Sequence, residues 1–181
     1  MYNPLKLSNI YNEVNVIRSL EIEAGNLLHQ RNLRLALAES CTGGLIGNRI
    51  TDVPGSSEYF IGSIVAYAYE AKVALLGVSW DTLNILGAVS RETVLEMAHG
   101  ARKALNTDVA VSVSGIAGPG GGTLDKPVGT TWIALVAEDG EWAHEFHFQG
   151  DREQNKSSAA DSALQLLLDY LQGKLKSDSH F

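Results

Sequence analysis

Residues 33–44 read LRLALAESCTGG, and this stretch decides the fold. Its first part alternates leucine with arginine and alanine up to Glu39, a pattern that predicts a short strand. Its second part sets hydroxyl residues and two glycines directly before an apolar helical run that starts at Leu45. A strand that passes through a glycine turn into a helix is typical of α/β proteins.

The rest of the chain continues the same alternation. Helical periodicity is predicted for residues 12–31, 70–76, 90–105 and 152–173, and strands are predicted for residues 59–67, 109–113, 130–136 and 142–148. The last two strands are joined by the turn at residues 138–140 and therefore predict an antiparallel hairpin. The sequence indicates an α/β layer with a mixed sheet.

Length and composition limit the function classes. A chain of 181 residues predicts one domain, residues 1–181, whose ends at 1–11 and 176–181 we expect to be flexible. The net charge of −7 argues against long nucleic acid as the ligand, although it allows a nucleotide. No apolar run long enough for a membrane span and no signal peptide are visible, so we expect no membrane partner.

Cysteine and histidine usage argues against disulfide and metal chemistry. Cys41 is the only cysteine, which excludes an intrachain disulfide and fits a reducing, cytoplasmic location. The five histidines are scattered, and His144 and His147 lie at a spacing that points them to opposite faces of a strand. We expect all five to be structural or solvent-exposed, and we expect no catalytic metal and no cofactor.

The first candidate site is the turn that holds Ser40, Thr42, Gly43 and Gly44. A turn at the start of a helix exposes backbone N–H groups, and these can bind an anion or stabilise an oxyanion beside a nucleophilic serine. The alternative is that Ser40 or Thr42 only caps the helix.

Lys72 is the second candidate because it follows an apolar strand. A desolvated lysine has a lowered pKa and can act as a general base, and Ser–Lys pairs replace Ser–His pairs in some hydrolases. Tyr67 and Tyr69 precede Lys72. The alternative is a solvated helix lysine with two packing tyrosines.

Two further segments have chemistry-bearing residues. Residues 114–122 read SGIAGPGGG after a strand, and such glycines let N–H groups approach an anion, although a plain surface loop is the alternative. The segment is not a P-loop, because no Gly-Lys-Ser/Thr follows it. Arg152 opens the last helix and can bind a carboxylate or phosphate, or form a surface ion pair.

Six ordered blocks together resemble one family. They are AESCTGG at 38–44, VPGSS at 53–57, AY at 66–67 with EAK at 70–72, GAVS at 87–90, SGIAGP at 114–119 and KPVGT at 126–130. This set resembles the C-terminal domain of the competence/damage-inducible protein CinA, a family that includes stand-alone nicotinamide mononucleotide deamidases. The resemblance runs from about residue 33 to residue 152.

The resemblance implies a three-layer α/β/α sandwich with a mixed, mostly parallel sheet. It implies a metal-free serine–lysine amidohydrolase that converts nicotinamide mononucleotide to nicotinic acid mononucleotide and ammonia, in pyridine nucleotide salvage. By position, Ser40 is the nucleophile, Lys72 the general base and Tyr67 an auxiliary residue. Residues that line the substrate site in the family fall at Thr42, Gly43, Gly44, Ser57, Ser114, Gly115 and Arg152. We also expect a small-molecule nucleotide as substrate and a homo-oligomer.

Two other classes of protein share some of these residues. Short-chain dehydrogenases also use Ser, Tyr and Lys, but they need Tyr-x-x-x-Lys, and neither Tyr67 nor Tyr69 has that spacing to Lys72. A non-catalytic nucleotide-binding paralogue of the same fold is the second alternative. It stays open because Tyr69 stands where the family commonly has asparagine.

Overall fold

The computed structural model describes residues 19–175. The described elements are α1 (Leu20–Arg31), β1 (Leu35–Glu39), α2 (Leu45–Thr51), η2 (Ser56–Glu58), β2 (Phe60–Val65), α3 (Tyr69–Leu76), α4 (Trp80–Leu86), α5 (Arg91–Leu105), β3 (Val109–Gly115), β4 (Thr130–Ala137), β5 (Gly140–His147) and α6 (Arg152–Leu171). The expected flexible ends, the start of the first predicted helix and His180 lie outside the described residues.

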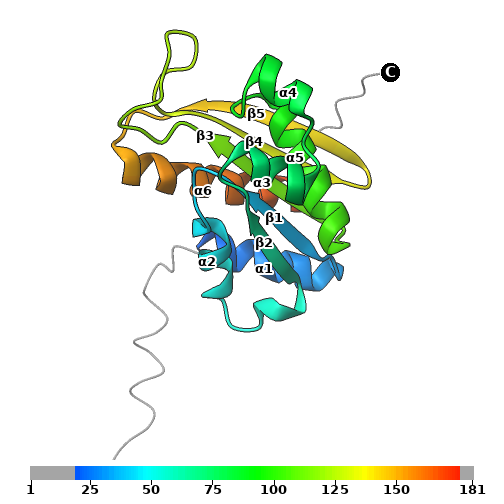
Figure 1. The fold of residues 1–181 in the computed structure, drawn as a ribbon. Coiled ribbons are helices and arrows are strands. Elements are labelled where there is room, and N and C mark those ends of the chain that lie inside the picture. The colour runs from blue at the N-terminus through cyan, green and yellow to red at the C-terminus, as the bar shows by residue number, and fades with distance from the viewer. Residues whose placement is uncertain (1–18, 176–181) are drawn as a thin grey trace, which may run out of the picture.

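A five-stranded mixed sheet forms the centre of the fold (Figure 1), with the strand order β2-β1-β3-β4-β5. β1 pairs in parallel with both β2 and β3, whereas β4 pairs antiparallel with β3 and with β5. Only β4 therefore runs against the other strands of this sheet. The mixed, mostly parallel sheet and the terminal hairpin are confirmed.

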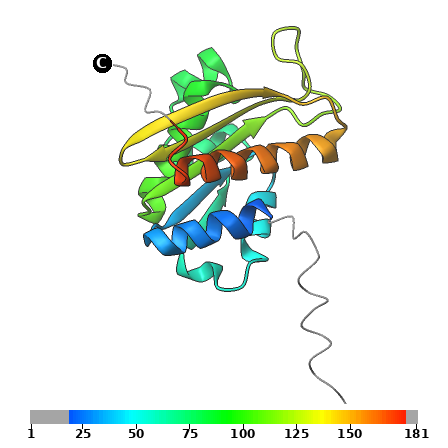
Figure 2. The ribbon, with the colours of Figure 1, turned by 180° about the vertical axis from the view of Figure 1, so that it is seen from behind.

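Helices cover both faces of the sheet. α1, α2 and α6 pack on one face, where Figure 2 shows α1 and α6 side by side. α5 packs on the other face, with α3 and α4 against it. The three-layer α/β/α arrangement is confirmed.

The composition of β1 follows from its position between these layers. Leu35 and Leu37 pack toward α1 and α6, whereas Ala36 and Ala38 pack toward α5. All five residues of β1 are buried. The alternating pattern that predicted this strand therefore reflects a face of large residues and a face of small residues, both of them covered.

The short helix α4 was not predicted from the sequence. Leu83 is its only buried residue, and Ile85 is 78% exposed. A helix whose apolar residues face solvent shows no amphipathic period, so pattern analysis misses it. Ser79 begins it by accepting a hydrogen bond from the Asp81 N–H.

The topology places three loops at one edge of the sheet. β1, β2 and β3 run in the same direction, so the segments that follow Glu39, Val65 and Gly115 leave the sheet at that edge. After β1 the chain adds β2 on one side of it and then β3 on the other. Ligands of α/β sheets bind at such a switch point, at the carboxyl ends of the strands.

Candidate active site

Ser40 and Lys72 meet at this edge of the sheet. Ser40 directly follows β1, and its N–H donates to the Val113 carbonyl at 3.1 Å, which continues the β1–β3 pairing by one residue. Lys72 lies in α3, and its Nζ donates a 2.9 Å hydrogen bond to Ser40 Oγ. The two residues are 32 positions apart in the chain. Their pairing predicted from the resemblance is therefore present in the geometry.

The amine of Lys72 is surrounded by neutral oxygens. Besides Ser40 Oγ, Nζ donates to the Ala66 carbonyl at 2.8 Å and to the Tyr67 carbonyl at 3.0 Å. The residue is 0% exposed, and within residues 19–175 it forms no ion pair with a carboxylate. Burial lowers the pKa of Lys72 to about 8. A proton-accepting amine is therefore present near neutral pH.

Cys41 stands beside Ser40 but is a poor nucleophile. Its side chain is buried, and burial raises the pKa of the thiol to about 11. The thiolate is the reactive form of cysteine, so at neutral pH the thiol is unreactive. Ser40, unlike Cys41, is hydrogen-bonded to a basic side chain, that of Lys72.

The carboxylate of Glu39 organises the turn after β1. Its oxygens accept hydrogen bonds from the hydroxyls of Thr42 and Ser63 and from the N–H groups of Gly44, Ile46 and Gly47, at 2.7–3.2 Å. These amides form the start of α2, where the helix dipole favours a negative charge. The chain's own carboxylate therefore occupies the N-terminus of α2.

This arrangement corrects two expectations about the turn. The residue before α2 is Gly44, which makes no side-chain cap, so neither Ser40 nor Thr42 caps the helix. The N–H of Gly44 binds Glu39 and the N–H of Gly43 binds the Ser40 carbonyl, so neither amide is available to a substrate. Both glycines have positive φ (+65° and +96°), which favours glycine there and lets the chain turn back onto Glu39.

Tyr67 and Arg152 lie next to the pair. Tyr67 is 62% exposed, and its hydroxyl accepts a 3.2 Å hydrogen bond from Arg152 Nη2. Its contact with Lys72 is made by the backbone carbonyl, not the ring. Arg152 Nη1 also donates to the Gly118 carbonyl at 2.7 Å. Arg152 therefore ties the loop after β2 to the loop after β3.

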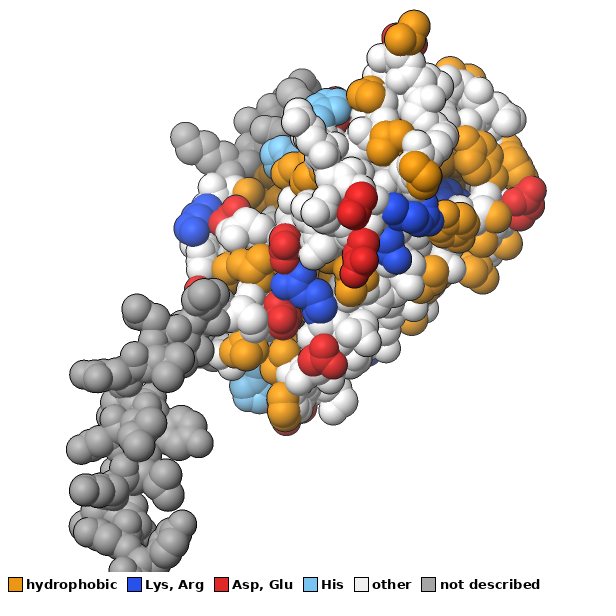
Figure 3. All heavy atoms as spheres, turned by 90° about the vertical axis from the view of Figure 1, so that its left-hand side faces the viewer, with side chains coloured by type: hydrophobic (Ala, Val, Ile, Leu, Met, Phe, Trp, Pro, Cys, Tyr) orange, Lys and Arg blue, Asp and Glu red, His pale blue; other side chains and the backbone are white. Residues whose placement is uncertain are grey.

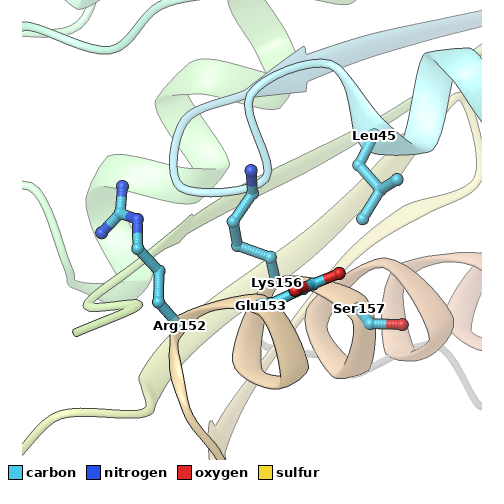
Figure 4. Close-up of a pocket in the computed structure, with 5 residues that line it drawn as sticks. All are labelled: Leu45, Arg152, Glu153, Lys156 and Ser157. Atoms are coloured by element: carbon cyan, nitrogen blue, oxygen red, sulfur yellow. The ribbon is translucent and has the colours of Figure 1, made fainter. Parts of the chain in front are cut away.

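A cavity of about 450 Å³ opens beside this cluster. It is lined by Leu45, Arg152, Glu153, Lys156 and Ser157 (Figure 4). Both basic side chains extend from the same end of α6, and in Figure 4 the amine of Lys156 reaches the turn after β1. The cavity thus has two basic groups, of which Lys156 lies against the turn that Ser40 begins, with its Nζ 3.9 Å from the position of a Cβ on Gly43.

Comparison with known proteins decides the family. The family model described as the CinA C-terminal domain matches residues 17–171. This chain belongs to the CinA C-terminal domain family. A putative competence-damage inducible protein of Halothermothrix orenii is 51% identical over 159 residues, which cover 87% of this chain and 38% of that protein. A CinA-like protein of Desulfotalea psychrophila is 48% identical over 147 residues, covering 81% of this chain and 36% of the relative.

Solved CinA-superfamily structures share the fold. The competence/damage inducible protein CihA of Agrobacterium tumefaciens superposes with a TM-score of 0.79 at 39% identity, covering 84% of this chain and 95% of that one. A CinA superfamily protein of Klebsiella pneumoniae superposes with a TM-score of 0.82 at 32% identity, covering 85% of this chain and 96% of that one. This chain spans less than two-fifths of the length of the curated relatives named above.

The remaining residues expected from the CinA resemblance divide between the two edges of the sheet. The β1–β3 register sets Ser114 opposite Ser40, on the α5 face of the sheet. Gly115 ends β3, and a Cβ there would overlap Thr131 Oγ1, so the close approach of β4 requires glycine at this position. Ser57 lies in η2, before β2 begins, and is therefore at the opposite edge from Ser40. Within one chain, the structure does not bring Ser57 to this site.

The start of the glycine-rich loop contacts α6 through backbone carbonyls. Figure 1 shows the segment between β3 and β4 projecting from the body of the molecule. Gly118 presents its carbonyl, rather than an N–H group, to Arg152, and the Ala117 carbonyl accepts from Asn155 Nδ2. The start of the loop therefore holds α6 in place.

Tyr69, the departure from the family pattern, contacts the loop before α5. Its hydroxyl accepts a 3.2 Å hydrogen bond from the Ala88 N–H, and its side chain is 38% exposed. The polar tip of Tyr69 is thus engaged by a neighbouring loop of the CinA fold.

Glu39 and Lys156 were not singled out from the sequence, although signals for both existed. A glutamate that ends a buried strand must have hydrogen-bond donors, which points to the turn that follows Glu39. Lys156 follows Arg152 by four residues, which puts both on one helix face.

The described histidines and acidic residues are dispersed over the fold. Among residues 19–175, no group of three or more His, Cys, Asp or Glu side chains is placed to hold a metal ion. His29, His99, His144 and His147 are exposed. No helix within the described part of the chain is long and apolar enough to cross a membrane.

Proposed function

We propose that this chain hydrolyses the carboxamide of nicotinamide mononucleotide to nicotinic acid mononucleotide and ammonia, by a Ser–Lys mechanism. The observation that carries the proposal is the 2.9 Å contact between Lys72 Nζ and Ser40 Oγ, made by a lysine that is 0% exposed. The choice of substrate rests on the resemblance of the sequence to the deamidases of the CinA family. The reaction class rests on the chemistry of the pair.

Two backbone carbonyls orient the base. A neutral amine has two N–H groups and one lone pair, and the carbonyls of Ala66 and Tyr67 are both within hydrogen-bond distance of Nζ. When these carbonyls take the two N–H groups, the lone pair of Lys72 is left for the Ser40 hydroxyl. The arrangement supports proton transfer from Oγ to Nζ.

The reaction then proceeds in two acyl-transfer steps. Lys72 takes the Ser40 proton while Oγ bonds to the carboxamide carbon, and the carbonyl π electrons move to oxygen. When the oxyanion collapses, the C–N bond breaks and the Lys72 ammonium gives its proton to the leaving ammonia. Water then attacks the resulting ester and gives a proton to Lys72, and Lys72 passes that proton to Ser40 Oγ when the ester C–O bond breaks. The carboxylic acid that is released ionises in solution.

The oxyanion needs N–H donors that the fold has not used. Within the described residues, the N–H groups of Cys41 and Thr42 donate to no oxygen, although both lie against the Cys41 thiol. The N–H of the residue after the nucleophile supplies oxyanion donors in other serine hydrolases. We assign this role to the amide of Cys41, with that of Thr42 beside it.

We also propose a cellular location, an oligomeric state and a partner for this chain. We place the protein in the cytoplasm, in pyridine nucleotide salvage and as a homo-oligomer, with a free nucleotide as its partner. Figure 3 shows one face of the molecule, on which basic side chains form small groups flanked by acidic ones. Small groups of this kind suit a single nucleotide better than a long nucleic acid.

The test is ammonia release from nicotinamide mononucleotide by the purified chain. Ser40→Ala and Lys72→Met should each abolish turnover, because one removes the nucleophile and the other removes the base. Ser162→Ala and Lys103→Met change matched residues outside the site and should leave turnover unchanged. Turnover that survives in Ser40→Ala contradicts the assignment of the nucleophile.

The non-catalytic alternative has its own outcome in this experiment. A nucleotide-binding paralogue would bind nicotinamide mononucleotide in calorimetry without releasing ammonia. Binding that is unaffected by Ser40→Ala, together with no turnover by the wild-type chain, would support that alternative.

A further inference from the structure

The two edge strands of the sheet differ in the side chains that they carry. The strand order leaves one side of β2 and one side of β5 without a neighbouring strand in the described part of the chain. β5 includes Glu141 and Glu145, whose side chains are both partly exposed. β2 reads FIGSIV and contains no charged residue and no proline. Charges and prolines are what usually keep an edge strand from pairing with another chain, so β5 is protected in this way and β2 is not.

The free side of β2 presents backbone groups that have no partner. The Ala66 N–H donates to the Glu39 carbonyl at 2.8 Å, so the backbone groups at this position face β1. These groups alternate in direction along a strand, which turns those of Ser63 and Val65 away from β1. Within residues 19–175, the N–H and carbonyl groups of Ser63 and Val65 form no hydrogen bond with another element. A strand from outside these residues can therefore pair with β2.

Two apolar side chains flank the unpaired backbone. Ile61 is 38% exposed and Val65 is 46% exposed, and Ser63 lies midway between them in the strand. Open hydrogen-bonding groups next to exposed apolar side chains are the features that strand addition uses.

Charge favours a second copy of this chain as the added strand. A two-fold axis at this edge would pair β2 with itself in the antiparallel sense. Because β2 is uncharged, no like charges would face each other across that pair. The same pairing of β5 would bring Glu141 and Glu145 of both copies into one ladder. In a chain with a net charge of −7, β2 is thus the edge at which two copies meet with the least repulsion.

We propose that β2 pairs antiparallel with β2 of a second copy, so that the two five-stranded sheets join into one continuous sheet. The inference rests on the homo-oligomer in the proposed function and names its interface, but it does not depend on the amide chemistry. With the two-fold axis at Ser63, Val65 lies opposite Ile61 of the partner subunit. Each exposed apolar side chain of β2 is then covered by the other copy.

The molecular mass of the full chain in solution tests the interface. Sedimentation velocity over a dilution series compares the wild type with Ile61→Lys and with Ile85→Lys, a matched change at a residue of α4 that is 78% exposed. We expect a dimer for the wild type and for Ile85→Lys. In Ile61→Lys the dimer dissociation constant should rise by about a hundredfold or more, because each lysine would be buried against Val65 of the partner subunit without a counter-charge.

Each other outcome of that experiment has a definite meaning. A dimer that survives in Ile61→Lys, or one that is lost in Ile85→Lys instead, would overturn the interface and leave the homo-oligomer standing. A monomeric wild type would overturn both, whereas ammonia release tests the amide chemistry separately.

Amide hydrogen exchange, measured by NMR, tests whether the backbone forms the contact. The N–H groups of Ser63 and Val65 should exchange slowly in the wild type and rapidly in Ile61→Lys, because pairing with the second copy is what protects them. The Ile64 N–H, which faces β1, should stay slow in both proteins and shows that β2 remains folded. Rapid exchange of Ser63 and Val65 in a wild-type dimer would overturn the strand pairing. Slow exchange in monomeric Ile61→Lys would overturn it too, since the edge would then be covered by its own chain.

Discussion

Lys72 Nζ lies 2.9 Å from Ser40 Oγ, in contact with two backbone carbonyls. The contact arises because β1 delivers Ser40 and the chain after β2 delivers α3 to the same edge of the sheet. The Ala66 N–H donates to the Glu39 carbonyl at 2.8 Å, which holds the segment after β2 against the end of β1. Two residues 32 positions apart thereby share one polar site with almost no solvent contact.

The first prediction is an acid limb in the pH–rate profile. Burial lowers the pKa of Lys72 to about 8, and only the deprotonated amine can accept the Ser40 proton. The value of kcat/KM should therefore rise about tenfold per pH unit below pH 8 and level off above it. Initial rates of ammonia release between pH 6 and pH 9.5 measure this. A profile that is flat across this range would rule out Lys72 as the base.

The second prediction separates the ring of Tyr67 from its backbone. Tyr67→Phe removes the hydroxyl that accepts from Arg152 and keeps the carbonyl that accepts from Lys72. We expect kcat/KM to fall by no more than about fivefold, the usual worth of one exposed hydrogen bond, with an unchanged acid limb. Steady-state kinetics check both quantities. If the ring of Tyr67, the auxiliary residue that the resemblance implies, relays protons, kcat should instead fall by a factor of about 10² or more.

The third prediction concerns the carboxylate of Glu39. In the wild type, the N–H groups of Gly44 and Ile46 donate to one carboxylate oxygen of Glu39, and the N–H of Gly47 donates to the other. Glu39→Gln replaces one of these oxygens by an NH₂ group, which cannot accept a hydrogen bond from an N–H. At least one buried N–H loses its acceptor, so we expect unfolding to need about 3 kcal/mol less free energy. Urea unfolding measures the loss.

Glu138→Gln is the matched control for that variant. Glu138 is exposed in the turn between β4 and β5, so the same chemical change should alter the free energy of unfolding by less than about 0.5 kcal/mol. Equal stabilities of the two variants would show that the hydrogen bonds of Glu39 do not hold the turn.

The sequence predicts most of the fold because local pattern and tertiary role agree there. The helix predicted from residue 90 is capped by Ser90, whose Oγ accepts from the Thr93 N–H, and α3 ends at Gly77, which has a positive φ of +69°. The sequence does not predict α4, because the apolar residues of this helix face outward and show no helical periodicity. It also leaves the order of the strands open, because order depends on contacts between residues distant in the chain.

The site is predictable only in part for a related reason. Residue type and family position single out Ser40 and Lys72, whose side chains then meet. They do not show which acceptor binds the amides of the glycine turn, and in the structure Glu39 binds them. They also do not show that Ser57, which belongs to one of the six sequence blocks, lies at the opposite edge of the sheet from Ser40. Both outcomes depend on three-dimensional placement.

The last prediction concerns the glycine that lets α5 approach α3. A Cβ on Gly100 would overlap the carbonyl of Leu76, the last residue of α3. Alanine favours a helix over glycine by about 1 kcal/mol, but backbone overlap cannot be relieved by a rotamer change. We therefore expect Gly100→Ala to lower the free energy of unfolding by about 3 kcal/mol and, because α3 carries Lys72, to lower turnover as well.

Gly120→Ala is the control, since a Cβ there meets nothing within 4 Å. Denaturation of the two variants side by side decides the matter: a Gly100→Ala protein as stable as Gly120→Ala would mean that the α3–α5 contact tolerates a shift.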